Sequence, residues 1–158
     1  MGRIVSINVS HKKHVTKGPV NQANLLEDLG IEGDAHAAPG DRQVSLLMQA
    51  SVDKMRDLLA EKWREEPDRK RNKKLALDPG AFAENLTVDG IDLLSLSIGD
   101  ELTAGEGVIL RVSKIGKECH HGCAIFKELG DCIMPREGIF CAVVRGGLIR
   151  PGDPIVPR

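Results

Sequence analysis

Aromatic side chains are scarce in this sequence, which has one Trp, three Phe and no Tyr among 158 residues. Proteins that hold single-stranded nucleic acid stack its bases on aromatic side chains. The formal net charge of −1 also gives no positive field that would attract a phosphate backbone. We therefore expect that nucleic acid is not the main partner of this protein.

Long apolar runs are also missing. The apolar stretch at the N-terminus, residues 1–10, is too short and too interrupted for a signal peptide or a membrane span. We expect a cytoplasmic protein with no membrane partner. A chain of this size does not need disulfide bridges, and in a reducing compartment its four cysteines are better interpreted as thiols.

No internal repeat is visible, and the length fits one domain, residues 1–158, that buries its own core. Within it, residues 62–74 form a mixed-charge run with a basic end, which is typical of a solvated surface excursion.

Short runs rich in β-branched residues, separated by glycine-containing turns, predict a fold that is mainly β. The expected strands are residues 3–10, 44–48, 84–88, 98–102, 108–115, 138–145 and 151–156. Many short strands with few helices favour a β-barrel that is closed or nearly closed, with a few short helices.

One helix is expected to begin at Ser51, because serine is a good N-cap. Its apolar face would carry Val52, Met55, Leu58 and Leu59. Residues 121–129 also have helical character, with Gly130 as a stop. Residues 20–29 fit either a helix or an extended segment.

The densest chemical signal is the segment Gly116-Lys117-Glu118-Cys119-His120-His121-Gly122-Cys123, which follows the expected strand 108–115. A helix start, Lys117 and a protonated imidazole would all favour the thiolate of Cys119, whereas Glu118 would oppose it. A thiolate attacks sulfur and binds soft metals. The alternative is that Cys119 and the other cysteines are small buried hydrophobic residues.

A second candidate is the glycine-rich segment 30–43, which contains His36, Arg42 and Gln43. Small residues let a ligand approach the backbone closely. The alternative is a surface loop with ordinary turn chemistry.

Six motifs follow one another in a specific order and together cover nearly all of the chain. They are Gly33-Asp34-Ala35-His36, residues 42–47, residues 82–90, residues 98–102, Gly116-Lys117-x-Cys119, and Gly147-x-Ile149-x-x-Gly152-Asp153. In this respect the chain resembles a stand-alone MOSC domain, the family named for the C-terminal domain of molybdenum-cofactor sulfurases.

The resemblance implies a barrel-like fold, a link to the pterin-based molybdenum cofactor, and a cysteine, here Cys119, that carries sulfur or contacts the metal. It also implies that the loop with His36 and Arg42 and the segment with Asn85 surround the pocket of that cysteine. It favours an extended conformation for residues 20–29.

Side-chain chemistry then suggests roles for these residues around the cofactor. Arg42 is the first candidate for the phosphate, with Lys117, Arg136 and Arg145 as weaker ones, and Gln43 and Asn85 would contact the pterin edge. His36 would either hydrogen-bond the cofactor or cap its own loop.

Three hypotheses remain open. The first is a molybdenum-cofactor protein in which Cys119 accepts a persulfide, contacts the metal, or both. Its persulfide would come from a cysteine desulfurase or another donor, since the chain has no room for a pyridoxal-phosphate domain, and its cofactor would be exchanged with molybdoenzymes or cofactor-synthesis proteins. The second is a cofactor-dependent reductase of N-hydroxylated compounds. The third is a structural or zinc-stabilised binding module with Cys119, His120 or His121, and Cys123 as ligands.

Overall fold

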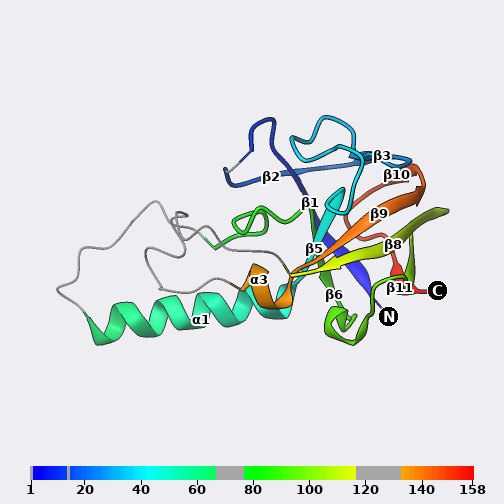
Figure 1. Ribbon diagram of the computed structural model, residues 1–158. Coiled ribbons are helices and arrows are strands. Elements are labelled where there is room, and N and C mark those ends of the chain that lie inside the picture. The colour runs from blue at the N-terminus through cyan, green and yellow to red at the C-terminus, as the bar shows by residue number, and fades with distance from the viewer. Residues whose placement is uncertain (1, 14, 67–76, 117–132) are drawn as a thin grey trace.

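The computed structural model describes residues 2–13, 15–66, 77–116 and 133–158. Within these ranges the chain is mainly β, with two α-helices and one 3-10 helix (Figure 1). In chain order the elements are β1 (Arg3–Val9), β2 (Gly18–Val20), β3 (Ala23–Leu26), β4 (Gly30–Ile31), β5 (Val44–Met48), α1 (Gln49–Glu65), β6 (Leu86–Asp89), η1 (Leu93–Ser95), β7 (Glu101–Ala104), β8 (Val108–Ile115), α3 (Met134–Glu137), β9 (Ile139–Arg145), β10 (Gly147–Ile149) and β11 (Ile155–Pro157).

Each strand expected from the sequence overlaps a strand of the structure, and two have the expected bounds, whereas 98–102 and 151–156 overlap β7 and β11 only at their ends. β5 spans Val44–Met48 and β8 spans Val108–Ile115. In β8, Val108, Leu110 and Val112 are buried while the residues between them are less so, which is the alternation of a strand with one face on the core. Residues 20–29 contain β3, so the extended interpretation of this segment is correct.

Eight strands form one sheet in the order β11-β7-β8-β9-β5-β6-β1-β2, and β10, β3 and β4 form a second, three-stranded sheet. The strands of the larger sheet pair antiparallel except for β5 and β6, which run parallel and are linked by α1 and the chain that follows it. Parallel strands need such a crossover, because a tight turn reverses the chain and can join only antiparallel neighbours.

The closed or nearly closed barrel expected from the sequence is not confirmed, because the ladder of the larger sheet is open, with β11 and β2 at its two ends. Backbone bonds do join the start of β1 to the chain before β11. The amide of Ile4 donates to the carbonyl of Asp153 at 2.8 Å, and that of Gly152 donates to the carbonyl of Ile4 at 2.7 Å. The contact is a single bridge between Arg3 and Pro154 rather than a paired strand.

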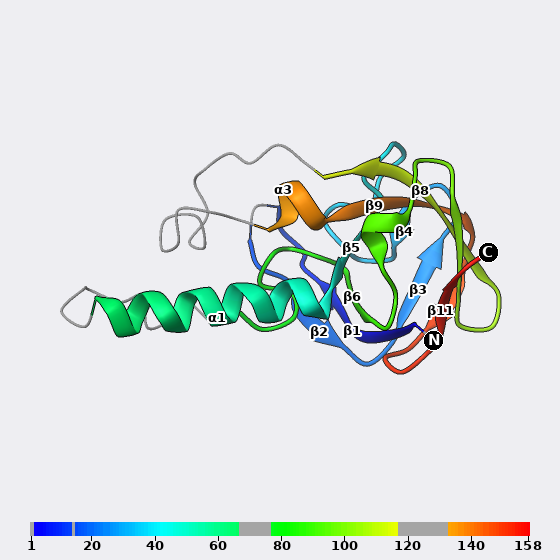
Figure 2. The ribbon, with the colours of Figure 1, turned by 90° about the horizontal axis from the view of Figure 1, so that it is seen from below.

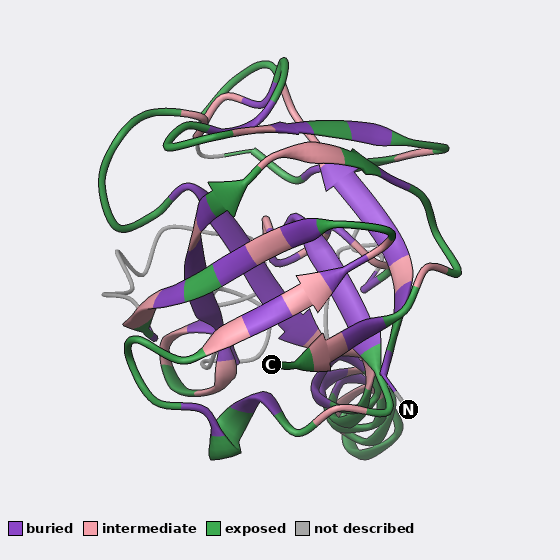
Figure 3. Cartoon of the chain, turned by 90° about the vertical axis from the view of Figure 1, so that its right-hand side faces the viewer, coloured by how far each residue is buried: buried purple, intermediate pink, exposed green. Residues whose placement is uncertain are grey.

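Two hydrophobic clusters fill the interior. The larger lies inside the curved sheet and includes Ile7, Leu46 and Leu110, each fully buried. The buried residues in Figure 3 mark this inner face. The second lies between α1, α3 and the outer side of the sheet, and consists of Leu47, Val52, Met55, Leu59, Leu77, Phe82, Ile133, Met134 and Phe140.

The helix α1 begins at Gln49, and its capping position is Met48, three residues before the expected N-cap. Ser51 therefore lies in the first turn, where its hydroxyl donates to Oε1 of Glu137 at 2.8 Å instead of capping the helix. Val52, Met55 and Leu59 are buried as expected, but Leu58 is exposed because it lies at the margin of the apolar stripe. In both ribbon views α1 extends away from the sheet (Figure 2).

The last four residues of α1, 62–65, are also the first residues of the charged run 62–74. Residues 67–74 of that run lie outside the described ranges. The expected helix 121–129 also lies outside them. No helix among the described residues is long and apolar enough to cross a membrane.

Candidate functional site

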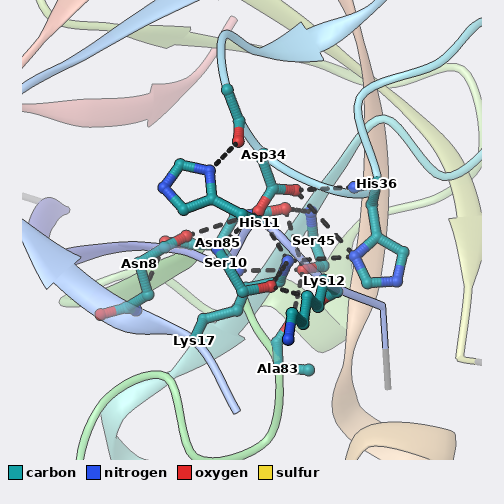
Figure 4. Close-up of polar contacts among 11 residues, drawn as sticks. Asn8, Ser10, His11, Lys12, Lys17, Asp34, His36, Ser45, Ala83 and Asn85 are labelled. Carbon is teal, nitrogen blue, oxygen red and sulfur yellow. Dashed lines mark hydrogen bonds and ion pairs between the residues drawn. The ribbon is translucent and has the colours of Figure 1, made fainter. Parts of the chain in front are cut away.

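Three connections meet beyond the end of β1: the residues between β1 and β2, the loop after β4, and the chain that enters β6. The amide of Ala35 donates to the carbonyl of Ser10 at 2.7 Å, and the amide of Lys17 donates to the carbonyl of Gly80 at 2.9 Å. Gly80 allows this approach, since a Cβ there would lie 2.3 Å from the Lys17 carbonyl oxygen. Polar side chains from these connections form a cluster at this point (Figure 4).

Lys17 lies at the centre of the cluster, and its side chain has no exposed surface. Its ammonium nitrogen is 2.7 Å from Oδ1 of Asp34, 3.0 Å from Nδ1 of His36 and 3.4 Å from Oγ of Ser10. An ammonium group has three protons and no lone pair. All three of its hydrogen bonds are therefore used within the protein.

Asp34, also with no exposed side-chain surface, compensates the charge of Lys17. Its Oδ1 accepts from the amide of Ser10 at 3.1 Å, and its Oδ2 accepts from the amide of His36 at 3.2 Å. Burial disfavours the charged carboxylate, but the hydrogen bonds from Lys17 and Ser10 outweigh this effect and hold the pKa of Asp34 below its ordinary value. Asp34 is thus a carboxylate that ties the loop after β4 to the end of β1.

Two histidines belong to the cluster, and their partners differ. His36 is 35% exposed at its side chain, and its Nδ1 faces the ammonium of Lys17. His11 is exposed, and its Nδ1 lies 3.1 Å from the carbonyl oxygen of Gly33. The structure thus places His36 at the surface of the cluster, with one ring nitrogen inside it.

Asn85 lies beneath the cluster and is 1% exposed. Its Oδ1 accepts from the amide of Ser45 at 3.0 Å and from the hydroxyl of Ser45 at 3.2 Å, while its Nδ2 donates to the carbonyl of Asn8 at 3.0 Å. The side chain therefore bridges the entry of β6 to β5 and β1. Its contact with a pterin stays a prediction, to which these internal bonds lend no support.

Gln43 is fully buried, and its amide is also engaged inside the protein. Its Oε1 accepts from the amide of Val143 at 2.9 Å, and its Nε2 donates to Oδ1 of Asp28 at 2.9 Å and to the carbonyl of Gly40 at 3.1 Å. This arrangement fixes the end of the loop before β5. The predicted pterin contact of Gln43 is not tested, but its hydrogen-bonding groups already have protein partners.

Arg42, by contrast, is exposed, and its guanidinium lies over the ring of Phe140, 5.8 Å from the ring centroid. The preceding residue is tied to β8, because the hydroxyl of Ser113 donates to the carbonyl of Asp41 at 2.7 Å. The loop carrying Arg42 therefore lies beside the last residues of β8, just before Gly116. The next predicted site residues along the chain, Lys117 and Cys119, lie outside the described residues.

Glu84, the residue before Asn85, has a buried carboxyl group that the sequence did not reveal. Glu84 has no exposed surface; its Oε2 accepts from the hydroxyl of Thr87 at 2.8 Å and its Oε1 from the amide of Phe82 at 3.2 Å. Burial raises the pKa of Glu84, and these hydrogen bonds offset only part of that effect. The residue lies within the predicted strand 84–88, where a strand pattern alone gives no sign of a buried acid.

Lys17 was also missed, because a lysine in a basic segment such as residues 11–17 is ordinarily exposed. The nearest signal was the Gly-Asp pair at Gly33 and Asp34, since a small loop that buries an aspartate needs a cation. Nothing in the sequence said which cation it would be.

The described residues contain no group of three or more His, Cys, Asp and Glu side chains that could hold a metal ion. The zinc ligands considered above, at positions 119, 120, 121 and 123, are not among them. Cys141 is fully buried in the larger cluster, and burial raises the pKa of its thiol to about 12. It therefore behaves as a core residue and not as a nucleophile.

A cavity of about 280 Å³ lies where α1 begins and β6 ends. It is lined by Met48, Ala50, Val88, Asp89, Gly90, Ile91 and Asp92, and none of the predicted site residues contributes to it. We place the candidate site at the Lys17 cluster and the adjoining Arg42 loop instead, because the exposed polar groups that can bind an anion lie there.

The MOSC domain family model matches residues 21–156, so the chain belongs to the MOSC domain family. Proteins of this family are associated with functions related to the molybdenum cofactor. Among the curated proteins, none matches the chain.

Solved structures share the fold. The YuaD protein from Bacillus subtilis aligns with a TM-score of 0.73 and 18% identity over 98% of this chain and 94% of its own. YiiM from Escherichia coli aligns with a TM-score of 0.64 and 22% identity over 100% of this chain and 70% of its own. YiiM from Geobacillus stearothermophilus gives a TM-score of 0.63 and 22% identity, over 100% and 75% of the two chains.

The residues at this site can be compared with what a molybdenum cofactor requires, namely donors for an anionic phosphate and for acceptor-rich groups. Arg42 meets the first requirement, because its guanidinium is exposed and makes no ion pair within the described part of the chain. His36 meets the second, because part of its ring is exposed. Lys17, Gln43 and Asn85 hold the loops that carry these two residues.

Proposed function

We propose that this protein binds or passes on the molybdenum cofactor in the cytoplasm, and that Cys119 is the residue that accepts a persulfide sulfur or contacts the metal. The observation that carries the proposal is the bond between Ser113 and Asp41, which fixes the Arg42 loop beside the strand that leads toward Cys119. An exposed guanidinium held next to the strand that precedes a cysteine-bearing segment suits a large anionic ligand whose other end is rich in sulfur.

Sulfur transfer requires a thiol that accepts a sulfur atom readily and can then release that atom to an acceptor. The thiolate of Cys119 would attack the outer sulfur of a donor persulfide; the donor S–S bond would break, a new S–S bond would form on Cys119, and the donor would leave as a thiolate. The donor would be a cysteine desulfurase, and the acceptor a molybdoenzyme or a cofactor-synthesis protein. The cofactor, when bound, would supply a redox metal held by dithiolene sulfur.

Sulfur loading tests the first half of this proposal. The protein would be incubated with a cysteine desulfurase and free cysteine, and mass spectrometry would locate any added sulfur atom. We expect the adduct on wild type and on Cys141→Ala, because Cys141 is buried in the core, and no adduct on Cys119→Ser. An adduct that persists on Cys119→Ser would refute the assignment.

Cofactor retention tests the second half. Protein expressed in a host that makes the cofactor would be analysed for molybdenum, tungsten, zinc and pterin. We expect pterin with molybdenum or tungsten in wild type and at least a several-fold loss in Arg42→Gln, which removes the guanidinium. Zinc without pterin would support the zinc-stabilised module, and turnover of N-hydroxylated compounds by the loaded protein would support the reductase.

A further inference from the structure

We propose that Lys114 joins Arg42 in a two-cation binding site for a phosphate dianion, on the outer side of the larger sheet beside Phe140, and that Ser113 positions Arg42 in this site. The assignment of the site to the phosphate of the cofactor rests on the proposed function. The pairing of the two cations does not, because it follows from the strand register and from contacts of the described residues.

The first step is an irregularity in β8. Val112 lies opposite Cys141 and Lys114 lies opposite Phe140, so Ser113 is an extra residue in β8, a β-bulge. A bulge changes the direction in which a side chain leaves the strand, and bulges are common next to functional sites. Here the bulged residue reaches a neighbouring loop, as its hydroxyl contacts show.

The hydroxyl of Ser113 joins three parts of the chain. Its oxygen lies 2.7 Å from the carbonyl oxygen of Asp41 and 3.2 Å from the carbonyl oxygen of Phe140. The residue before Arg42 is thereby fixed to β8 and to β9 at the level of Phe140. Ser113 therefore positions the Arg42 backbone without touching a ligand itself.

The second step places Lys114. Residues directly opposite each other in an antiparallel pair project from the same face of the sheet. The ring of Phe140 belongs to the second hydrophobic cluster, on the outer side of the sheet, so Lys114 leaves the sheet on that side as well. Lys114 is half-buried, which is typical of a lysine whose stem lies along an apolar surface while its ammonium stays in water.

The third step places Arg42 beside the same ring. Its guanidinium carbon lies 5.8 Å from the centroid of Phe140. Phe140 thus has one cation against its ring and a second one opposite it on the neighbouring strand. Both side chains are long and donate only, so their N–H groups can converge on different oxygens of one phosphate.

Both cations are also without an ion pair in the part of the chain that the structure describes. Arg111, three residues before Lys114 on the same strand, is different, because its guanidinium lies 2.8 Å from Oε2 of Glu101. The positive charge of Arg111 is thus compensated, whereas the charges of Lys114 and Arg42 are available to an anion.

Two acidic residues lie near this site along the chain. Glu137 is already engaged, because its Oε2 lies 3.0 Å from Nζ of Lys54. Asp41 is exposed and forms no ion pair with either cation of the site. Two uncompensated cations favour a phosphate dianion over an anion with a single charge.

The test is a titration of the ¹⁵N-labelled protein with inorganic phosphate, at a slightly alkaline pH and at an ionic strength held constant with sodium chloride. NMR would follow the Nε–H signal of Arg42 and the amides of residues 113–115. We expect saturable shifts of these signals in wild type with one common dissociation constant. Shifts that do not saturate would overturn the proposal.

Three variants with the same loss of charge show whether the two cations act together. Lys114→Gln and Arg42→Gln should each raise the dissociation constant for phosphate at least about three-fold. Arg111→Gln, the matched control on the same strand, should change it by less than about 1.5-fold. An effect of Lys114→Gln no larger than that of Arg111→Gln would refute the role of Lys114.

Ser113→Ala tests the positioning role, because it removes the hydroxyl and leaves both charges in place. We expect weaker phosphate binding together with a lower order parameter for the Nε–H group of Arg42. Lys114→Gln should weaken binding without changing that order parameter. An unchanged order parameter and an unchanged dissociation constant in Ser113→Ala would refute the positioning role.

Retention of pterin and molybdenum in a cofactor-making host decides whether the site serves the cofactor. Lys114→Gln should lose several-fold more of both than Arg111→Gln. Equal retention in the two variants would refute this assignment, even if wild type carries the cofactor. Wild type that binds inorganic phosphate through both cations but carries no cofactor would refute the proposed function and support the phosphate site alone.

Discussion

Lys17 and Asp34 form an ion pair between two loops, yet neither side chain has exposed surface. Removing two charges from water is costly, and that cost is recovered only if each charge is fully hydrogen-bonded. Here Lys17 makes three polar contacts, and both oxygens of Asp34 accept hydrogen bonds. Removal of one partner from such a pair costs about 3–5 kcal/mol, so a variant of either residue should be checked for folding before its function is interpreted.

Glu84 leads to a prediction about pH. Its pKa is raised in the folded protein, so folding favours the protonated form. Its contribution to the free energy of unfolding is therefore present below the pKa of the unfolded chain and is lost as the pH rises through the folded value. We expect Glu84→Gln to raise the melting temperature relative to wild type at about pH 8, with the difference shrinking toward about pH 4.

Circular dichroism during heating at several pH values checks this expectation. Glu106→Gln, at an exposed glutamate in the turn between β7 and β8, is the control and should show no such trend. A lower melting temperature for Glu84→Gln at alkaline pH would mean that the hydrogen bonds of the carboxylate, from Thr87 and the backbone, matter more than its burial.

At the scale of single elements, the sequence predicted the regular strands best. β5 and β8 were predicted to the residue, because β-branched runs bounded by glycine or polar turns depend on local chemistry alone. The N-cap of α1 was three residues off, because Ser51 pairs with Glu137, a residue far along the chain, instead of capping the helix. A cap can be predicted only when no tertiary partner competes for its hydroxyl.

At the candidate site, too, local sequence patterns did not reveal partners that lie far along the chain. Arg42 and His36 were predicted on one loop, and the structure places both in the connection after β4, where Arg42 is exposed and His36 is partly buried. Lys17 was not predicted, because its burial depends on an aspartate 17 residues later in the chain. Gln43 and Asn85 were recognised as significant residues, but the sequence could not show that their amides bind other strands of the protein itself.

The junction between β8 and the Cys119 segment gives a prediction at the element scale. Gly116 has φ +70°, and a Cβ there would lie 2.3 Å from the carbonyl oxygen of Pro135. Gly99 has φ +98° and open space around it. Gly99→Ala should therefore cost about 1 kcal/mol from backbone strain alone, and Gly116→Ala about 2 kcal/mol or more, because the collision adds to the strain.

Urea unfolding followed by fluorescence of the one Trp measures both variants. Equal costs would mean that Pro135 and its neighbours yield easily. In that case the position where the chain leaves β8 would not be fixed by this contact.

At the scale of the whole molecule, the order of the sheet predicts where the protein opens first. β8 and β9 lie within the larger sheet, with partners on both sides, whereas β2 and β11 are its end strands and have three residues each. Amides in β8 and β9 should therefore exchange with deuterium at the rate of global unfolding, and those in β2 much faster. Hydrogen exchange resolved by NMR measures this, and equal rates in β2 and β8 would contradict it.

The overall closure of the fold was the feature that the sequence predicted least well. Strand patterns locate the longer strands and their inner face, but whether the first and last strands of a sheet meet depends on twist summed over all of them. Here the summed twist brings β1 and the chain before β11 together at a single bridge, without a ladder.

That bridge has a practical consequence. The amide of Ile155 donates to the carbonyl of Gly2 at 3.0 Å, and the ribbon views show the two ends of the chain close together (Figure 1). A few flexible residues could therefore join Arg158 to Gly2, and the chain could be reopened at an exposed turn such as the one at Glu106. In such a circularly permuted protein, β11 and β1 would become neighbours in sequence. The new termini, to which a reporter could be attached, would lie far along the chain from the Lys17 cluster.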